Sequence, residues 1–154
     1  MPEPTPVALT GGCQCGAVRY RIESAPAGGI VCHCRMCQKA GGAAFMAFAG
    51  VPIGNLVWTR GAPKIFASSD NAERGFCADC GTPLTWRPVG RDRLAVTLGS
   101  LDDPKAVAPV AQFAAEATLP WVGRVTELPV RQFSWSDVAS RQHPDHDTGS
   151  RTGG

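Results

Sequence analysis

The order of apolar and polar positions along the chain predicts short strands. Residues 17–22 alternate, with Val18, Tyr20 and Ile22 on one face and Arg19 and Arg21 on the other. That period of two is typical of a strand with one buried and one exposed face. Residues 93–99 are the best candidate for a buried strand. Further strands are predicted at 43–49, 55–59, 64–67, 74–77 and 82–87, with a turn at Pro52 and Gly54 after the first of them.

Helical structure is predicted only in short pieces. Residues 35–40 suit one helical turn before two glycines, and residues 111–117 fit either a short helix or a strand. The 18 glycines and 13 prolines interrupt regular structure often enough to disfavour a helical bundle. The fold class is therefore predicted to be mainly β, with strands joined by many turns.

The chain length of 154 residues predicts one folded domain, and the 44% of hydrophobic residues is enough for a normal core. We expect residues 1–10 to be a flexible lead and residues 11–135 a single domain. Residues 136–154 are polar and poor in aliphatic side chains, which predicts a disordered tail. His143 and His146 lie in that tail, and we expect both to be exposed to solvent with no role in metal binding.

The start of the chain and its charge limit the compartment and the partners. Met1-Pro-Glu-Pro lacks the basic segment and apolar run of a secretory signal, and no stretch approaches the ~20 apolar residues of a membrane span. We therefore expect a cytoplasmic protein with no membrane partner.

In a reducing compartment, seven cysteines are better explained as metal ligands than as disulfides. Seven thiolates and two Zn²⁺ would change the formal charge from +2 to −1, since seven negative and four positive charges are added. A net charge this close to zero does not favour a nucleic-acid partner.

The cysteines fall in three groups. The first is Cys13 and Cys15, the third is Cys77 and Cys80, and a glycine directly follows each pair. We call these two segments the outer knuckles. A loop of this kind wraps a metal ion with both sulfurs inward, and the glycine allows the positive φ of the turn that follows. Two knuckles supply four sulfurs, the number that closes a tetrahedral structural zinc site.

The middle group, Cys32, Cys34 and Cys37, has three cysteines within six residues and no glycine after the last. Three sulfurs from one loop can hold a second zinc ion and leave its fourth position free. Three protein ligands with one exchangeable position is the general layout of a catalytic zinc site. The spacing therefore favours two Zn²⁺ per chain, a structural one on the outer knuckles and a catalytic one on the middle group.

Three alternatives stay open from the spacing alone. His33 or a distant residue could fill the fourth position of the middle site, although the side chain of His33 should point away from a metal shared by its two neighbours. Cys13 and Cys15 could instead join two of the middle cysteines, as in a zinc ribbon. Either outer pair could also form a disulfide.

A zinc site with three thiolates and one open position favours a sulfur-containing fourth ligand. Its formal charge of −1 makes it a weaker Lewis acid than a site with three histidines. Some deaminases with three cysteine ligands activate water, but the glutamate motif that those enzymes carry precedes neither cluster here. A free thiol of pKa ~8.5 would lose its proton on such a metal and become ready to attack a small carbonyl carbon. Arg35, Lys39 and Asp79 adjoin the cysteine loops, and each taken alone is better explained as surface charge.

Ordered motifs extend over most of the chain. They are Gly12-Cys-Gln-Cys-Gly16, Cys32-His-Cys-Arg-Met-Cys37, Gln38-Lys39, Gly41-Gly-Ala-Ala-Phe45, Gly61-Ala-Pro-Lys-Ile-Phe66, Phe76-Cys-Ala-Asp-Cys-Gly-Thr-Pro-Leu84 and Val96-Thr-Leu-Gly-Ser-Leu-Asp-Asp103. Over about residues 11–123, this pattern resembles the glutathione-dependent formaldehyde-activating enzymes, also called the CENP-V/GFA family.

The resemblance implies a β-tent (Mss-four-like) fold, a curved β-sheet arrangement with zinc knuckles and few short helices. It also implies a carbon–sulfur lyase that joins formaldehyde to glutathione to give S-(hydroxymethyl)glutathione. The zinc ligands that it implies are Cys13, Cys15, Cys77 and Cys80 for the structural ion and Cys32, Cys34 and Cys37 for the catalytic ion.

Two segments depart from the family pattern, and we expect both to lie near the substrate pocket. Gln112-Phe113-Ala114 stands where members often have a His-Ile-Trp-like strand, and Gln38 stands where a basic residue often follows the last cysteine. Two other functions stay open, a non-catalytic zinc-binding or interaction module and a hydrolase or lyase that uses zinc-bound water on another small substrate. A redox role for Cys77 and Cys80 is disfavoured, because no βαβ pattern surrounds them. The sequence does not fix the oligomeric state.

Overall fold

A computed structural model describes residues 8–147, which form two β-sheets. The smaller sheet has the order β1-β2-β5, and its strands span Leu9–Gly12, Arg19–Ile22 and Leu56–Arg60. Both of its strand pairs are antiparallel. Because β1 begins at Leu9, the last two residues of the expected N-terminal lead belong to this sheet, and residues 1–7 lie outside the described part.

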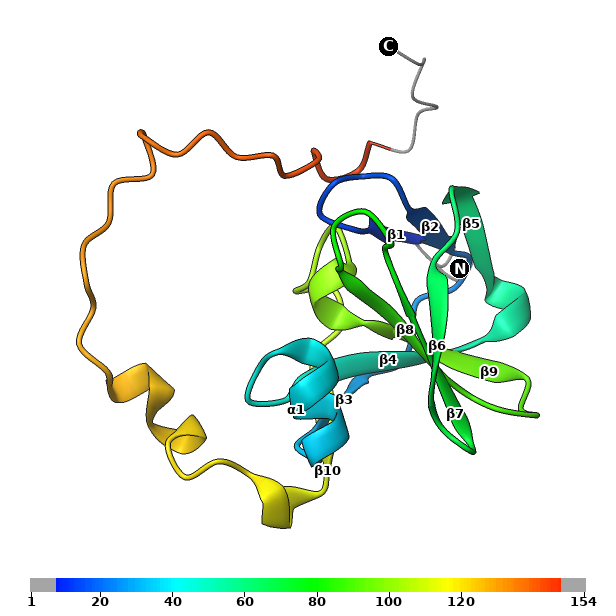
Figure 1. The fold of residues 1–154 in the computed structure, drawn as a ribbon, viewed down its shortest axis with the longest axis horizontal. Helices are drawn as coiled ribbons and strands as arrows, with labels where there is room; N and C mark the ends of the chain where they lie inside the picture. The colour runs from blue at the N-terminus through cyan, green and yellow to red at the C-terminus, as the bar shows by residue number, and fades with distance from the viewer. Residues whose placement is uncertain (1–7, 148–154) are drawn as a thin grey trace, which may run out of the picture.

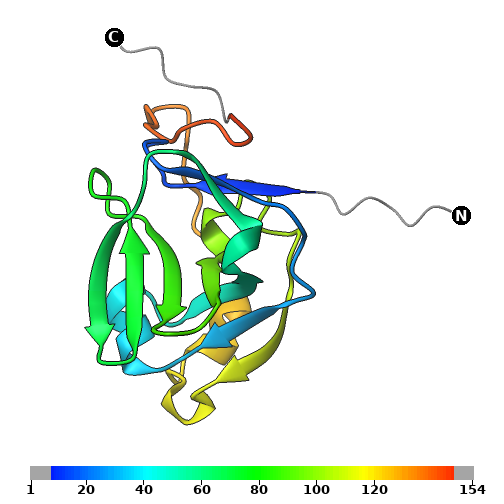
Figure 2. The same ribbon diagram turned by 90° about the vertical axis from the view of Figure 1, so that its right-hand side faces the viewer.

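The larger sheet has the strand order β10-β3-β4-β9-β8-β7-β6. Its neighbours pair in antiparallel fashion except β10 and β3, which are parallel. Figure 1 and Figure 2 show that this sheet is strongly curved and that the smaller sheet lies across one end of it. The strands span Gly29–Cys32 (β3), Met46–Pro52 (β4), Lys64–Ser69 (β6), Ala72–Phe76 (β7), Pro83–Pro88 (β8), Arg93–Thr97 (β9) and Pro109–Phe113 (β10).

Helices are few and short, as predicted. The one α-helix, α1, spans Arg35–Gly41, and single 3₁₀ segments span Ile53–Asn55, Leu98–Ser100, Ala115–Ala117 and Val122–Glu127 in the described part of the chain. The mainly β fold class is therefore confirmed. No helix within residues 8–147 is both long and apolar enough to span a bilayer.

Most predicted strands are found with ends shifted by one or two residues, and the segments at 43–49 and 111–117 differ more. β4 begins at Met46 rather than at residue 43, because Gly42 ends α1 in a left-handed conformation and the Ala43 N–H still bonds the carbonyl of Gln38. The undecided segment 111–117 contains both structures, since β10 ends at Phe113 and a 3₁₀ turn follows from Ala115.

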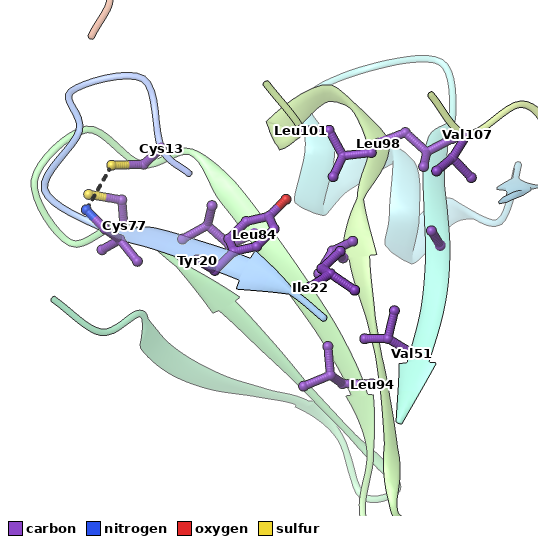
Figure 3. Close-up of a cluster of buried hydrophobic side chains, with 13 residues drawn as sticks. Cys13, Tyr20, Ile22, Val51, Cys77, Leu84, Leu94, Leu98, Leu101 and Val107 are labelled. Carbon is purple, nitrogen blue, oxygen red and sulfur yellow. Dashed lines mark hydrogen bonds between the residues drawn. The ribbon is translucent and has the colours of Figure 1, made fainter. Parts of the chain in front are cut away.

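The apolar core lies where the two sheets meet. Tyr20 and Ile22 on β2 pack against Leu84 on β8 and Val96 on β9, and all four side chains are fully buried. Figure 3 shows Tyr20, Ile22 and Leu84 between the sheets, with Cys13 and Cys77 at one end of the same cluster. Burying one large aliphatic side chain contributes ~1.5–3 kcal/mol. β9 confirms the buried strand predicted at 93–99, although it ends at Thr97 and a 3₁₀ segment begins at Leu98.

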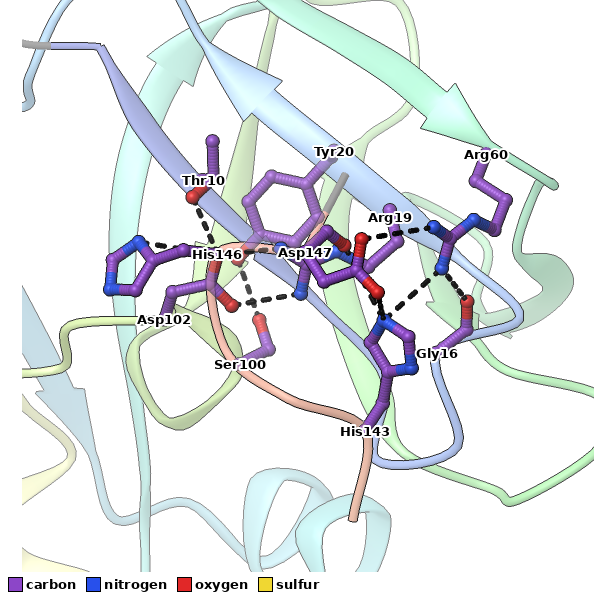
Figure 4. A network of polar contacts seen from close by, with 10 residues as sticks. All are labelled: Thr10, Gly16, Arg19, Tyr20, Arg60, Ser100, Asp102, His143, His146 and Asp147. Atoms are coloured by element: carbon purple, nitrogen blue, oxygen red, sulfur yellow. Dashed lines mark hydrogen bonds and ion pairs between the residues drawn. The ribbon is translucent and has the colours of Figure 1, made fainter. Parts of the chain in front are cut away.

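The prediction that Arg19 faces solvent is wrong. The register of β2 against β5 shifts between Arg19 and Tyr20, so strict alternation fails at this end of the strand. Arg19 is only 2% exposed, and its Nη1 and Nη2 donate to the two carboxylate oxygens of Asp102 at 2.8 and 2.5 Å. The Thr10 hydroxyl donates to the same carboxylate (Figure 4). This buried pair joins the smaller sheet to the segment that follows β9.

Asp102→Asn is expected to lower the free energy of unfolding by ~3 kcal/mol, because it leaves the Arg19 charge buried without its partner. Burial raises the pKa of Asp102, but hydrogen bonds from Arg19 and Thr10 outweigh burial and hold this pKa below its ordinary value. A carboxyl group with a lowered pKa stabilises the fold at pH values above its ordinary pKa of ~3.9. This stabilisation is lost as the pH falls through the folded-state pKa.

Urea unfolding at pH 7 and at lower pH measures this effect. The difference between wild type and Asp102→Asn should shrink as the solution becomes more acidic than about pH 4. Asp103→Asn is the matched control, because Asp103 is exposed and next in the chain. Equal urea midpoints for the two variants would show that the buried pair has no such role.

Candidate metal centres

Four sulfur atoms meet where the outer knuckles approach each other. Cys13 and Cys15 follow β1, Cys77 and Cys80 follow β7, and their four Sγ atoms all lie within 4.8 Å of one another. The Sγ of Cys15 is 3.6 Å from that of Cys13 and 3.8 Å from that of Cys77. Tetrahedral zinc–thiolate bonds of ~2.3 Å place sulfurs ~3.8 Å apart, so the four thiols fit one Zn²⁺.

The backbone of both knuckles has the conformation that the glycines were predicted to allow. Gly16 has φ +76° and Gly81 has φ +78°, a region that side-chain-bearing residues rarely adopt. In the first knuckle the Val18 N–H donates to Cys13 Sγ at 3.2 Å. In the second, the Thr82 hydroxyl lies 3.1 Å from Cys80 Sγ. These polar contacts stabilise thiolates at the positions where a metal would need them.

The expectation that His143 is exposed to solvent is wrong. Its side chain is 12% exposed, and its backbone N–H donates to the carbonyl of Gln14 at 2.7 Å. The ring lies against Gly16, where an added Cβ would collide with it, and Arg60 binds both the Gly16 carbonyl and the His143 ring (Figure 4). The chain beyond β10 runs in a wide loop and returns here, so it covers the first knuckle (Figure 1). His146 is exposed, as expected.

Three further sulfur atoms meet at the start of α1. Cys32 ends β3, Cys34 is the N-cap of α1 and accepts a hydrogen bond from the Cys37 N–H at 3.4 Å, and Cys37 lies in the first turn. Their Sγ atoms also lie within 4.8 Å of one another. No histidine, aspartate, glutamate or further cysteine among residues 8–147 joins this group. The structure therefore brings the seven cysteines together as four and three, not in the alternative pairing, and all seven are free thiols.

His33 points away from the three sulfurs, as predicted from its place between two of them. Its Nε2 is 3.1 Å from Gln112 Oε1, and its ring packs against Phe45 with centroids 5.6 Å apart. Gln38 is also buried, and its amide donates to the carbonyls of His33 and Ala117. Both departures from the family pattern thus include a glutamine that fixes the cysteine loop to the segment around β10.

The pKa values within each cluster are divided. Burial raises the pKa of Cys15 to about 12. Burial also acts to raise the pKa of Cys80, but hydrogen bonds from Thr82 outweigh it and lower this pKa to about 6. In the second cluster burial raises the pKa of Cys32 to about 12, whereas N–H groups of the first helical turn lower that of Cys34 despite burial. Each cluster thus has a thiol whose pKa is lowered beside one whose pKa is raised. A divalent cation would replace the thiol protons and let every sulfur ionise.

A cavity of about 650 Å³ opens beside the second cluster and is lined by all three of its cysteines. Its volume lies in the ~300–1,000 Å³ range of small-molecule sites. Phe48, Trp86 and Phe113 supply apolar wall, so the expectation that the 112–114 segment adjoins the pocket holds for Phe113. Gln38 does not line it.

The same cavity is also lined by three arginines, Arg74, Arg91 and Arg93, and by no acidic residue of the described chain. Sequence reasoning missed all three, because they are scattered over β7, β9 and the turn before β9. Arg35, Lys39 and Asp79, which adjoin the cysteine loops in sequence, are exposed and do not line it.

Comparison with known proteins agrees with this geometry. The family model described as "Glutathione-dependent formaldehyde-activating enzyme" matches residues 8–117, a span that contains all seven cysteines. The chain belongs to this family. A crystal structure of a Rhodobacter sphaeroides protein is similar to the fold, with a TM-score of 0.54 and 22% sequence identity over 68% of this chain and 99% of that one. The matched span includes every strand of both sheets and both cysteine clusters.

Proposed function

We propose that this protein is a zinc-dependent carbon–sulfur lyase that joins a thiol to formaldehyde, with glutathione as the thiol. The observation that carries the proposal is the second cluster, in which three sulfurs and no fourth metal-binding side chain of residues 8–147 face a cavity of about 650 Å³. The first cluster has four sulfurs and is complete as a structural site. Family membership supports the choice of formaldehyde and glutathione.

Cys13, Cys15, Cys77 and Cys80 would hold a structural Zn²⁺, and Cys32, Cys34 and Cys37 would hold a catalytic one. A zinc ion on the second cluster would supply positive charge that favours the ionised form of an incoming thiol. Thiolate ligands suit zinc among the divalent metals of the cell. Seven free thiols also suit the reducing cytoplasm, where we place the reaction.

The wall of the cavity supports a thiol that carries carboxylates. Arg91 and Arg93 are exposed at the cavity, and within residues 8–147 neither is held in an ion pair. Glutathione has two carboxylates, and arginine binds a carboxylate through two parallel hydrogen bonds. The apolar wall of Phe48, Trp86 and Phe113 would exclude water from the reacting carbonyl.

The reaction needs no redox partner. One C–S bond forms between the thiol sulfur and the formaldehyde carbon, the thiol loses its proton, and the carbonyl oxygen gains one. The chain therefore has to bind the thiol, favour its ionised form and hold the small aldehyde beside it. Such positioning is the part of catalysis that a preformed cavity supplies.

The test is a panel of thiols with formaldehyde, followed by NMR of the hydroxymethyl product. The same mixtures without protein give the spontaneous rate, which is subtracted. We expect acceleration with glutathione and less with a neutral thiol such as 2-mercaptoethanol. The proposal would be contradicted if the protein accelerated the reaction of none of these thiols, or if it hydrolysed a small substrate instead of adding a thiol to formaldehyde.

Arg93→Glu is expected to raise the KM for glutathione about tenfold with little change in kcat, because reversing an exposed charge at the cavity costs about 1.4 kcal/mol of carboxylate binding. The KM for 2-mercaptoethanol should stay within about twofold, since that thiol has no carboxylate. Arg87→Glu makes the same charge change at an exposed position of β8 that does not line the cavity. Equal KM increases for the two thiols would argue against carboxylate recognition.

A further inference from the structure

Arg74 is a buried cation whose hydrogen-bond partners are sulfur atoms. It lies on β7 opposite Trp86 of β8, and its residue is 9% exposed. Its Nη2 donates to Cys37 Sγ at 3.4 Å, and its Nη1 donates to Met46 Sδ at 3.6 Å. It lines the 650 Å³ cavity and also a second cavity of about 470 Å³.

Arg74 pairs with no carboxylate of the described chain. The other deeply buried arginine, Arg19, shows what such a residue ordinarily needs, because Asp102 binds it through both carboxylate oxygens. A buried guanidinium without a counterion costs several kcal/mol. The fold therefore has to supply negative charge to Arg74 from another source.

The three cysteines of the second cluster are that source. Three thiolates and one Zn²⁺ carry a formal charge of −1, and the Arg74 guanidinium brings the group to zero. The contact is with a single ligand atom, Cys37 Sγ, and Cys37 is buried in α1. A charged donor strengthens a hydrogen bond to a thiolate and fixes the direction of its lone pairs.

We infer that Arg74 is the positioning and charge-balancing residue of the second metal centre, which it stabilises through Cys37. The inference rests on the proposed function, since it requires a metal ion on Cys32, Cys34 and Cys37. β7 continues directly into the second knuckle, so one strand serves both centres.

The test measures metal affinity and the electronic spectrum of the full chain loaded with Co²⁺. Arg74→Met and Arg74→Gln remove the charge, Arg74→Lys keeps it, and Arg93→Met removes a charge from the same cavity without contact to a ligand sulfur. Chelator competition gives the affinity of the more weakly held ion, and the sulfur-to-cobalt charge-transfer band reports the donor strength of the thiolates. Retention of the first ion shows that each variant is folded.

Loss of a ligand's hydrogen-bond partner typically weakens metal binding 10–100-fold. We expect a loss of that size and a shifted charge-transfer band in both neutral variants, with affinity within about threefold of wild type for Arg74→Lys and Arg93→Met. Unchanged affinity and spectrum in either folded neutral variant would overturn the inference and leave the proposed function standing. Uptake of a single ion by the wild-type protein would contradict both.

Discussion

Cys80→Ser is expected to give an unfolded or insoluble chain. Cys80 is one of four sulfurs that join the segment after β1 to the segment after β7, far apart in sequence. A serine hydroxyl is not ionised near neutral pH and binds zinc poorly, so the variant should lose the structural ion. Binding of structural zinc is worth on the order of 10 kcal/mol, which matches the ~5–15 kcal/mol that stabilises a whole domain. Circular dichroism, soluble yield and zinc content per chain measure the outcome.

Ala78→Ser is the control for this variant. It places a hydroxyl in the same knuckle at an exposed position that contributes no sulfur. It should fold and bind two zinc ions like the wild type. A folded Cys80→Ser protein that keeps both ions would show that the four-sulfur cluster is not the structural centre.

Cys34→Ser is expected to abolish activity and to lower the zinc content by one ion per chain, while the protein stays folded. Cys34 supplies a sulfur to the second cluster, and its Sγ also caps α1 by accepting the Cys37 N–H. Serine is among the preferred N-cap residues, so the helix keeps its cap although the metal ligand is lost. We expect glutathione-dependent turnover to fall to the spontaneous rate and the melting temperature to change by only a few degrees.

Cys34→Ala separates the two roles of this side chain. It removes both the sulfur and the cap, and loss of the cap costs about 1 kcal/mol beyond the effect of serine. Both variants should be equally inactive but differ in thermal stability. If Cys34→Ser unfolds as Cys80→Ser does, both clusters are structural and the proposed lyase activity has no site.

The local features of the fold could be predicted from the sequence, because they depend on neighbouring residues. The period of two at 17–22 predicted β2, and the glycine after each outer pair of cysteines predicted the positive φ of Gly16 and Gly81. The spacing of the cysteines favoured their division into four and three, which the structure has. For β2 and for the two glycines, the physical constraint acts within a few residues of chain.

The features that sequence reasoning missed depend on residues distant in the chain. Arg19 is buried because Asp102 lies beside it, and His143 is half-buried because the chain returns to the first knuckle. Arg74 meets Cys37 only because the curved sheet brings β7 to α1. A charged side chain in a half-buried strand is ordinarily placed on the exposed face, and only the three-dimensional partner reverses that placement.

Cadmium-113 NMR of protein loaded with ¹¹³Cd²⁺, before and after addition of glutathione, tests directly whether the second cluster is an open metal centre. Cadmium replaces zinc on thiolates, and its chemical shift depends on the number of sulfur donors. We expect two signals, one of which is typical of four sulfurs and does not move. The other should shift toward the four-sulfur position when glutathione is added, and it should be missing in Cys34→Ser. A single signal, or two signals that both indicate four sulfurs and ignore glutathione, would contradict the claim that the middle cysteines form an open thiol-binding centre.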